Sequence, residues 1–469
     1  MLNDVASEIA GPIAYAINLS LRSGQVPADW KIAQVIPLHK SGNTSDENNH
    51  RPISVLPVVS KILEKAVHHQ LMDYLERNNL LSQNQFGYRS QCSTDLATAL
   101  FTDSIRKAAD KGSLTGAVFL DLSKAFDTLD HSRLLAKLKS YGVKGLAFNW
   151  FTDYLFQRFQ VVKLGQELST PCPLMCGVPQ GSILGPILFL IFFNDFEDCL
   201  QHSKVIQFAD DTVVYVSASN VTDIERKLNH DMSSIANYLE SNDLVINLKR
   251  GKTESMLFGT AKRISTVPPE SRDLKLYCNN NLINYTSSYT YLGTVLDQYL
   301  GLGANFDQKY KKASSKLGVL RKLLPLLTLE AAFAVYSSVI VSALKYNCIA
   351  QLNLNQTQQK KLRSLECRAN FMLKTKTTPI KNEIDKHAVL LVRKCLNGKV
   401  CEHFRDYFKI HEHRMNTRNN NILMQIPKVK LEFAKNSFFF LGAKLYNSLP
   451  KEIREINDGF KNKVKLFFK

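Results

Sequence analysis

The chain lacks any long uninterrupted apolar run, although 45% of its 469 residues are hydrophobic. A membrane-spanning helix needs about 18 or more consecutive apolar residues. The most apolar stretch, residues 183–193, is interrupted by Gly185 and Pro186. The N-terminus, MLNDVASEIAGP, lacks the basic segment that opens a secretory signal peptide. We therefore expect no membrane association, and a nuclear or cytoplasmic location.

Cysteine is sparse and irregularly spaced. The chain has nine cysteines, an odd number scattered over its whole length, which argues against a disulfide framework. A zinc site is the alternative for a group of cysteines and histidines near the C-terminus, but their spacing fits no common zinc finger. We do not expect these residues to bind metal: Cys395, Cys401, His403, His411 and His413.

Acidic residues are few in the last third of the chain. Residues 1–300 contain 28 Lys and Arg against 30 Asp and Glu, a net charge of −2. Residues 301–469 contain 32 against 12, a net charge of +20. A nearly neutral body with a strongly basic final third is typical of a protein that binds a polyanion, most simply nucleic acid.

Two adjacent aspartates, Asp210 and Asp211, separate two apolar runs that favour β-strands, VIQFA and TVVYV. A two-residue hairpin link normally takes glycine or asparagine, because its central residues need positive φ. A pair of aspartates in this place therefore indicates a functional site. The alternative for this pair alone is a solvated turn tip.

A third carboxylate, Asp121, ends the buried-strand pattern AVFL. Neighbouring strands lie about 4.8 Å apart, so this residue could meet the aspartate pair at one edge of a sheet. Clustered carboxylates repel one another unless cations lie between them, and Mg²⁺ prefers carboxylate, water and phosphate oxygens. Two such ions about 4 Å apart activate an attacking hydroxyl and stabilise the leaving oxygen in phosphoryl transfer.

The sequence around these aspartates resembles the reverse transcriptases of LINE-type (non-LTR) retrotransposons, most closely the jockey-like group. Seven stretches carry the resemblance, in the family's order, over roughly residues 20 to 300: WKIAQVIPLHKSG, HRPISVLPVVSKILEK, QFGYRSQCST, AVFLDLSKAFDTLDH, CGVPQGSILGPILFL, QFADDT and YLGTVLD. Several ordered motifs are far more specific than any one of them. A later stretch, GAKLYNSLPKEI, also resembles the C-terminal region of these elements.

The resemblance implies an α+β fold, a right-hand polymerase with fingers, an antiparallel-sheet palm and a helical thumb, followed by a basic C-terminal region. We expect an N-terminal helix at 1–20, fingers and palm at 21–300, the thumb at 301–375 and the basic region at 376–469. Full-length elements of this type carry an endonuclease before the polymerase, and Met1 here begins just ahead of the fingers. The resemblance therefore predicts a truncated copy, or a separate endonuclease that supplies the nick.

By the same resemblance, Asp121, Asp210 and Asp211 are catalytic and hold two Mg²⁺ ions, with Mn²⁺ as the alternative ion. Phe126 is implied to lie under the incoming sugar, where its ring would exclude a 2′-hydroxyl. The alternative role of Phe126 is that of a core residue. Gln180, in the motif GVPQGS, is implied to contact the nucleotide or the template strand.

Three basic residues are further candidates for nucleotide binding. Arg51 begins the RPIS segment, and Lys61 lies in the helix expected after it. In the family, basic residues of this part of the chain lie near the template and the incoming triphosphate. Lys252 occupies the loop in which a polymerase lysine protonates the pyrophosphate, although RGKT departs from the family's Ser-Lys-Thr pattern. An ordinary surface lysine or arginine is the alternative in each case.

Two functions from different classes follow. The first is an RNA-directed DNA polymerase that extends a primer DNA on a template RNA with dNTPs. The second is a catalytically inactive, nucleic-acid-binding remnant of such an element. The intact aspartate triad, with Phe126 and Gln180, favours the polymerase, because random decay should have removed some of these residues.

Overall fold

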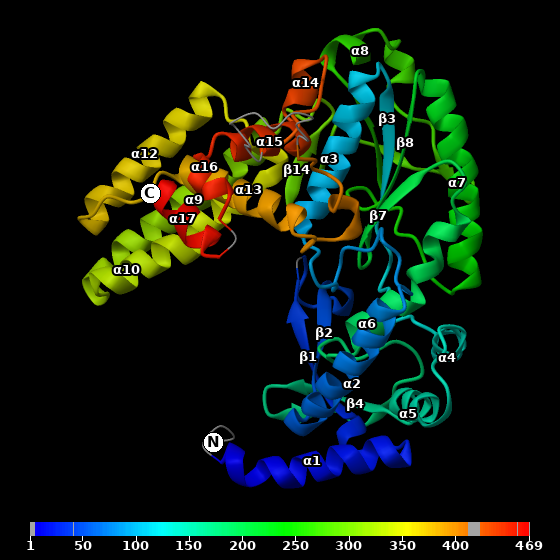
Figure 1. The fold of residues 1–469 in the computed structure, drawn as a ribbon. Coiled ribbons are helices and arrows are strands. Elements are labelled where there is room, and N and C mark those ends of the chain that lie inside the picture. Colours follow the sequence, from blue (N-terminus) through cyan, green and yellow to red (C-terminus); the bar gives the residue numbers. More distant parts are fainter. Residues whose placement is uncertain (1–4, 41, 411–422, 457, 469) are drawn as a thin grey trace. The chain divides into compact units, whose positions relative to one another are not determined.

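The computed structural model describes residues 5–40, 42–410, 423–456 and 458–468 (Figure 1). The chain forms two compact units, and each is assembled from separate stretches of sequence. The first contains Met1–Tyr88, Asp121–Gln201 and Asp231–Asn247. The second contains the remainder: Arg89–Leu120, His202–His230 and Leu248–Lys469.

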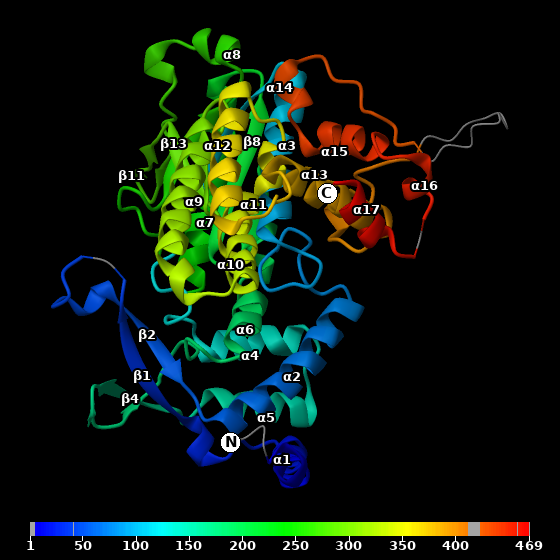
Figure 2. The ribbon, with the colours of Figure 1, turned by 90° about the vertical axis from the view of Figure 1, so that its left-hand side faces the viewer.

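The first unit combines helices with a small sheet in which β1 pairs antiparallel with β2 and parallel with β4. Strand β1 alternates exposed and buried residues, with Ala33 and Val35 facing the core. Figures 1 and 2 show β1 and β2 side by side. The elements are α1 (Ala6–Ser23), β1 (Ile32–His39), β2 (His50–Val55), α2 (Val58–Arg77), α4 (His131–Ser140), α5 (Gly145–Leu155), β4 (Phe159–Leu164), β5 (Glu167–Leu168), β6 (Cys172–Pro173) and α6 (Gly185–Phe192).

The helix ends follow local sequence signals. Helix α1 ends at Gly24, whose φ of 71° is the left-handed conformation that glycine adopts at low cost. Helix α4 begins after Asp130, whose side chain accepts a hydrogen bond from the Arg133 amide. Glycine after a helix and aspartate before one are typical helix-end residues.

The second unit is built on a five-stranded sheet in the order β12-β9-β3-β8-β7. All neighbouring pairs are antiparallel except β12 and β9, which pair in parallel. The predicted antiparallel palm is therefore correct apart from this edge strand. The strands are β3 (Leu114–Leu120), β7 (Lys204–Phe208), β8 (Asp211–Ala218), β9 (Glu254–Phe258) and β12 (Asn284–Tyr285).

Helices cover both faces of strand β3, which is why all seven of its residues are buried. On one face, Phe101 of helix α3 (Thr94–Asp110) packs edge to face against Phe119. On the other, a Cβ at Gly116 would come within 2.3 Å of Ile224 in helix α7 (Val221–Ser241). Glycine at this position therefore allows α7 to approach the strand closely.

One local prediction was wrong. The hairpin between β7 and β8 pairs Phe208 with Asp211, so its two central residues are Ala209 and Asp210 rather than Asp210 and Asp211. Outside the named strands, Ile246 forms a single antiparallel bridge with Leu122.

The rest of the second unit is mainly helical. Figure 2 shows α9, α10 and α12 lying side by side. The helices are α8 (Ala261–Ser265), α9 (Gly303–Leu323), α10 (Leu329–Val335), α11 (Ser342–Lys345), α12 (Gln356–Leu373), α13 (Ile380–Leu396), α14 (Glu432–Lys435), α15 (Phe438–Asn447), α16 (Lys451–Arg454) and α17 (Phe460–Phe467). A π-helical turn, Tyr336–Val341, joins α10 to α11. Two short hairpins lie between α8 and α9 in the sequence: β10 (Tyr277–Cys278) with β11 (Asn281–Leu282), and β13 (Ser288–Tyr291) with β14 (Thr294–Asp297).

The C-terminal region is an integral part of this unit. The fully buried carboxylate of Asp103, in α3, accepts hydrogen bonds from the amides of Phe438 and Phe439, both at 3.0 Å. It also accepts one from the Tyr407 hydroxyl at 2.6 Å and faces the Arg106 guanidinium at 3.5 Å. A buried carboxylate needs such partners, so residues more than 300 positions apart in sequence complete one core.

No helix in the described part of the chain is both long enough and apolar enough to cross a membrane.

Candidate active site

The β7–β8 hairpin presents the aspartate pair at its tip. Ala209 has a φ of 58°, a left-handed conformation that costs a residue with a Cβ about 1–2 kcal/mol. Asp210 is the second turn residue and is half-buried, whereas Asp211 is exposed and begins β8. Backbone strain of this kind is typical of functional turns. The sequence did not signal it, because alanine is not a usual turn residue.

The pairing of β3 with β8 fixes where this tip lies in the sheet. The ladder runs from Leu114 opposite Ala218 to Leu120 opposite Thr212. Leu120, the last residue of β3, thus lies beside Thr212, which follows Asp211. Asp121 is the next residue of the chain after Leu120.

Asp121 is held by a residue that the sequence analysis missed. The side-chain amide of Asn247 donates a 2.9 Å hydrogen bond to Asp121 Oδ2, and its backbone amide donates one of 2.8 Å to the Asp121 carbonyl. The amide of Ser123 donates to the carbonyl of Val245 at 2.8 Å in the same segment. These contacts orient the Asp121 carboxylate. Asn247 carries no local signal, because the two segments are far apart in sequence.

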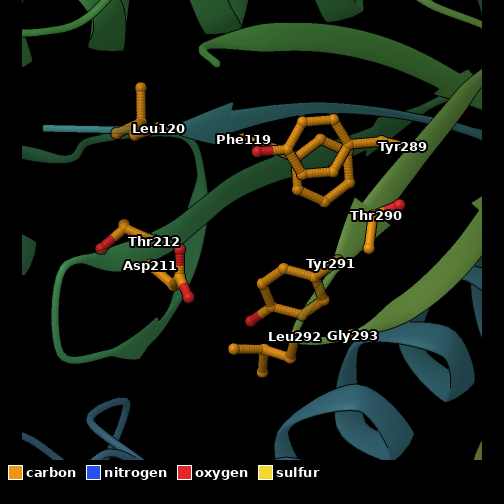
Figure 3. A pocket seen from close by; sticks show the side chains of 9 residues that line it. All are labelled: Phe119, Leu120, Asp211, Thr212, Tyr289, Thr290, Tyr291, Leu292 and Gly293. Atoms are coloured by element: carbon orange, nitrogen blue, oxygen red, sulfur yellow. The ribbon is translucent and has the colours of Figure 1, made fainter. Parts of the chain in front are cut away.

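A cavity of about 120 Å³ lies beside Asp211 in the second unit. Figure 3 shows its lining side chains, which come from β3, β8 and the β13–β14 hairpin. Phe119 and Tyr289 stack at 4.1 Å along one side. Tyr291 is fully buried, and burial together with the nearby charge of Asp211 raises its pKa well above the usual value. The cavity therefore combines aromatic surface with one exposed carboxylate.

The turn between β13 and β14 closes this cavity. Leu292 and Gly293 both have positive φ, 45° and 73°, the conformation of a tight two-residue hairpin. The carbonyl of Leu292 accepts hydrogen bonds from the Tyr346 hydroxyl at 3.0 Å and from the Asn347 side chain at 2.9 Å. The YLG motif, identified in the sequence by resemblance, is thus fixed by residues just after α11.

In the first unit, Gln180 is bound to Asp127. The Gln180 amide nitrogen donates to both carboxylate oxygens of Asp127, at 2.8 and 3.0 Å. Burial raises the pKa of Asp127, and the bond from Gln180 and the charges of Lys124 and Arg51 oppose that rise. Gly181 has a φ of 124°, and a Cβ there would lie 2.6 Å from the Ser54 carbonyl oxygen. Glycine is therefore required for the Gln180 loop to pack on β2.

The end of the Gln180 loop is anchored by Glu64 of α2, which is 1% exposed. Glu64 Oε2 accepts a 2.6 Å hydrogen bond from the Ile183 amide just ahead of α6, and its Oε1 accepts one of 3.1 Å from the Tyr154 hydroxyl. Burial raises the pKa of Glu64, while these bonds and the charge of Arg158 oppose the rise. Sequence reasoning did not identify Glu64, because its partners lie about 90 to 120 positions away.

Phe126 lies half-buried next to this loop. Its ring stacks on Phe189 of α6 with centroids 4.5 Å apart, and its carbonyl accepts a 2.9 Å hydrogen bond from the Val178 amide. One face of the ring is therefore packed, and the side chain is partly accessible. This arrangement is compatible with either of the two roles considered for Phe126.

The three basic candidates lie in different surroundings. Arg51, on β2, is exposed and close enough to Asp127 to act on its pKa. Lys61 is half-buried on α2. Lys252 is half-buried in the loop before β9, and its carbonyl accepts a 3.1 Å hydrogen bond from the Tyr289 hydroxyl. Arg51 thus belongs with Asp127 and Gln180, and Lys252 with the cavity residue Tyr289.

The cysteines and histidines near the C-terminus were not expected to bind metal. Cys395 and Cys401 are buried, and burial raises the pKa of the Cys395 thiol to about 12. His411 and His413 lie outside the described residues.

Comparison with protein families identifies the class of this fold and site. Residues 38–296 match the model of the reverse transcriptase (RNA-dependent DNA polymerase) family. This match spans more than half of the chain, and the chain belongs to that family. The membership and the polymerase fold predicted from the ordered motifs are therefore confirmed.

Several relatives of this chain are RNA-directed DNA polymerases of transposons or mobile elements. The chain is 27% identical over 400 residues to the probable RNA-directed DNA polymerase from transposon BS of Drosophila melanogaster, covering 80% of this chain and 42% of the relative. It is 27% identical over 345 residues to the RNA-directed DNA polymerase from mobile element jockey of the same organism, covering 71% of this chain and 36% of the relative. The chain thus spans about two fifths of the length of these relatives.

Among solved structures, apo telomerase from Candida tropicalis, truncated from its C-terminal domain, matches 58% of this chain and 54% of its own. The identity is 14% and the TM-score is 0.40, a similarity too low to support a functional comparison.

Proposed function

We propose that this chain is an RNA-directed DNA polymerase of a non-LTR retrotransposon, which extends a primer 3′-hydroxyl with dNTPs on an RNA template. The observation that carries the proposal is the register of β3 and β8, in which Leu120 lies opposite Thr212. Chain connectivity then brings Asp121 and Asp211, the neighbours of these two residues, to the same end of the two strands. Family membership supports the same activity.

The donor set fits divalent metal ions. Asp121, Asp210 and Asp211 would supply carboxylate oxygens, which suit the hard ions Mg²⁺ and Mn²⁺. Two bound ions would lower the barrier by activating the primer hydroxyl and stabilising the leaving pyrophosphate. Asn247 holds one of these carboxylates through Asp121 Oδ2 at 2.9 Å, which fixes its orientation before substrate binds.

The other candidates have distinct proposed roles. Arg51 and Lys61 would bind the triphosphate, the former by its planar guanidinium and the latter as a point charge. Gln180, oriented by Asp127, would contact the nucleotide or template. Phe126 would lie under the sugar. Lys252, in the loop before β9, would donate a proton to the leaving pyrophosphate.

The basic final third of the chain would bind the template–primer duplex. Its net charge of +20 suits a phosphate backbone. Exposed cations lie along α12, among them Lys360 and Arg363. These residues would contribute affinity rather than sequence specificity, because phosphate contacts carry no base information.

Primer extension on poly(rA)·oligo(dT) with dTTP and Mg²⁺ tests the proposal. We expect template-dependent extension by the wild-type chain. Asp121→Ala and Asp210→Ala should each abolish extension and leave RNA affinity within about twofold, because each removes a metal ligand and no basic group. Asp211→Ala should act in the same way.

Asp223→Ala is a matched control. Asp223 lies in the first turn of α7 and pairs with Arg226 at 3.5 Å, and its removal should leave extension unchanged. Full activity in Asp121→Ala or Asp210→Ala would rule out the proposed site. RNA binding without extension by the wild-type chain would favour the inactive remnant instead.

A further inference from the structure

A second group of metal-ligand side chains lies in the second unit, outside the proposed active site. Asp95, Cys348 and His387 each offer a ligand atom, and these atoms lie within 4.8 Å of one another. Within the described residues, this is the one group of three or more such side chains at this spacing. Asp95 lies more than 200 positions before Cys348, and Cys348 lies about 40 positions before His387, so no sequence motif marks the group.

The three ligands come from three separate elements. Asp95 lies in the first turn of α3, and His387 lies in the middle of α13. Cys348 begins a short 3₁₀ turn, Cys348–Gln351, directly after Asn347, whose φ of 46° sets the direction of the chain. His387 Nε2 and Asp95 Oδ2 are 2.9 Å apart. Packing of α3, the 3₁₀ turn and α13 therefore converges on this point.

The polar groups at this point are incompletely satisfied. Asp95 Oδ1 is buried and has no hydrogen-bond partner. A buried carboxylate oxygen in this state is costly, and a bound cation would supply the missing partner. Cys348 is 3% exposed, and it lines a small cavity together with Lys309 and Gln351.

We propose that Asp95, Cys348 and His387 form a zinc-binding site that ties α13 and the 3₁₀ turn to α3. Oxygen, sulfur and nitrogen ligands together suit Zn²⁺, which commonly takes four such ligands in a tetrahedron. The fourth position would be filled by water or by the second carboxylate oxygen of Asp95. A thiolate disfavours Mg²⁺, so this site would be chemically distinct from the catalytic one.

The geometry needs only a small adjustment. Tetrahedral zinc ligands lie roughly 3.5 Å apart, as follows from bond lengths of about 2.0 to 2.3 Å. Atoms within 4.8 Å of one another reach this spacing by side-chain rotation of about an ångström. Binding would also remove the proton from Cys348, because a coordinated thiol is held as the thiolate.

Lys309 is the charged group that opposes a cation here. Its ammonium donates a 2.6 Å hydrogen bond to the Tyr346 carbonyl. Burial lowers its pKa, and the nearby Cys348 and Asp95 partly offset that fall. The alternative to a zinc site is therefore a charge cluster in which His387 and Lys309 neutralise Asp95.

Co²⁺ and Zn²⁺ added to the full chain in excess Mg²⁺ distinguish these two possibilities. We expect one Co²⁺ to bind and to give the ultraviolet absorption of a cobalt–thiolate bond, which Zn²⁺ then removes. Cys348→Ser should lose this band. Cys278→Ser, a change at an equally buried cysteine in the same unit, should keep it. The aspartates of the active site contain no sulfur and cannot produce the signal.

Two further variants test the remaining ligands. Asp95→Asn and His387→Gln should weaken Zn²⁺ binding on the order of 10–100-fold or more, with circular dichroism as the check on folding. Lys309→Met should tighten binding several-fold, because it removes a neighbouring positive charge. Absence of the thiolate band in the wild type, or its survival in Cys348→Ser, would overturn the proposal. Neither readout depends on polymerase activity.

Discussion

The side-chain amide of Asn247 donates a 2.9 Å hydrogen bond to Oδ2 of Asp121, while its backbone amide binds the Asp121 carbonyl. One residue thus fixes both the backbone and the carboxylate of a proposed metal ligand. Groups that orient a ligand in this way affect metal affinity as well as rate. Asn247 is therefore a positioning residue for the proposed chemistry.

Replacing Asn247 by alanine should lower kcat about tenfold, because a hydrogen bond contributes about 1–1.5 kcal/mol and about 1.4 kcal/mol is a factor of ten in rate. The Mg²⁺ concentration for half-maximal extension should also rise, since Asp121 would no longer be held in one orientation. Asn281→Ala, a change at an exposed asparagine in the β10–β11 hairpin, is the control. A lowered melting temperature with an unchanged Mg²⁺ dependence would show that Asn247 is only structural.

Phe126→Val should admit ribonucleotides if the ring lies under the sugar. We expect the ratio of kcat/KM for dTTP over UTP to fall at least tenfold, equivalent to about 1.4 kcal/mol of differential transition-state binding. Removal of the ring that stacks on Phe189, 4.5 Å between centroids, should also lower the melting temperature.

Phe151→Val provides the comparison for that experiment. Phe151 is a buried residue of α5 in the same unit, and its truncation should lower the melting temperature without changing the dTTP/UTP ratio. If Phe126→Val behaves like Phe151→Val, Phe126 is a core residue.

Glu64 should make the protein's stability depend on pH. Burial raises its pKa above the ordinary value of 4.5, so the folded state binds the proton more tightly than the unfolded state. The contribution of Glu64 to stability is therefore largest below pH 4.5 and declines as pH rises toward the raised pKa. The free energy of unfolding of the wild type, minus that of Glu64→Gln, should decrease as pH rises from 4.5 through the raised pKa of Glu64. A difference that increases with pH would mean that Arg158 and the hydrogen bonds outweigh burial.

The exposed lysines of α17 test the nucleic-acid role of the basic C-terminal region. Changing Lys461, Lys463 and Lys465 together to glutamine should reduce the slope of log affinity against log salt, by about 0.7 for each phosphate of single-stranded RNA that is no longer bound. The control changes three exposed lysines of the first unit, Lys65, Lys139 and Lys144. Equal slopes in both variants would place the binding surface elsewhere. Deleting residues 376–469 is a poorer test, because it removes the buried partners of Asp103.

Local patterns predicted the parts of the site that depend on neighbours in sequence. The apolar runs on either side of Asp210 and Asp211 gave β7 and β8, and the run before Asp121 gave β3. The turn itself was misplaced by one residue, because the positive φ of Ala209 is imposed by strand pairing and not by its side chain.

Contacts between distant segments could not be predicted from a single sequence. Asn247 reaches Asp121 across 126 positions, and Ile183 reaches Glu64 across 119. Both partners are ordinary residues with no local pattern. The same limitation hid the group of Asp95, Cys348 and His387, whose members become neighbours only when α3 and α13 pack.

The bonds from Phe438 and Phe439 to Asp103 also set an order of events during synthesis. The amide of Phe438 is made 335 residues after Asp103, which at translation rates of about 5–20 residues per second is a delay of roughly 20 to 70 s. During that interval Asp103 and Arg106 emerge from the ribosome without the partners that allow their burial. The hydrophobic face of α3 must then stay partly open or be shielded by a chaperone. A premature stop codon between Lys252 and Phe438 would therefore leave Asp103 of α3 without these partners, even though every proposed catalytic residue had been translated.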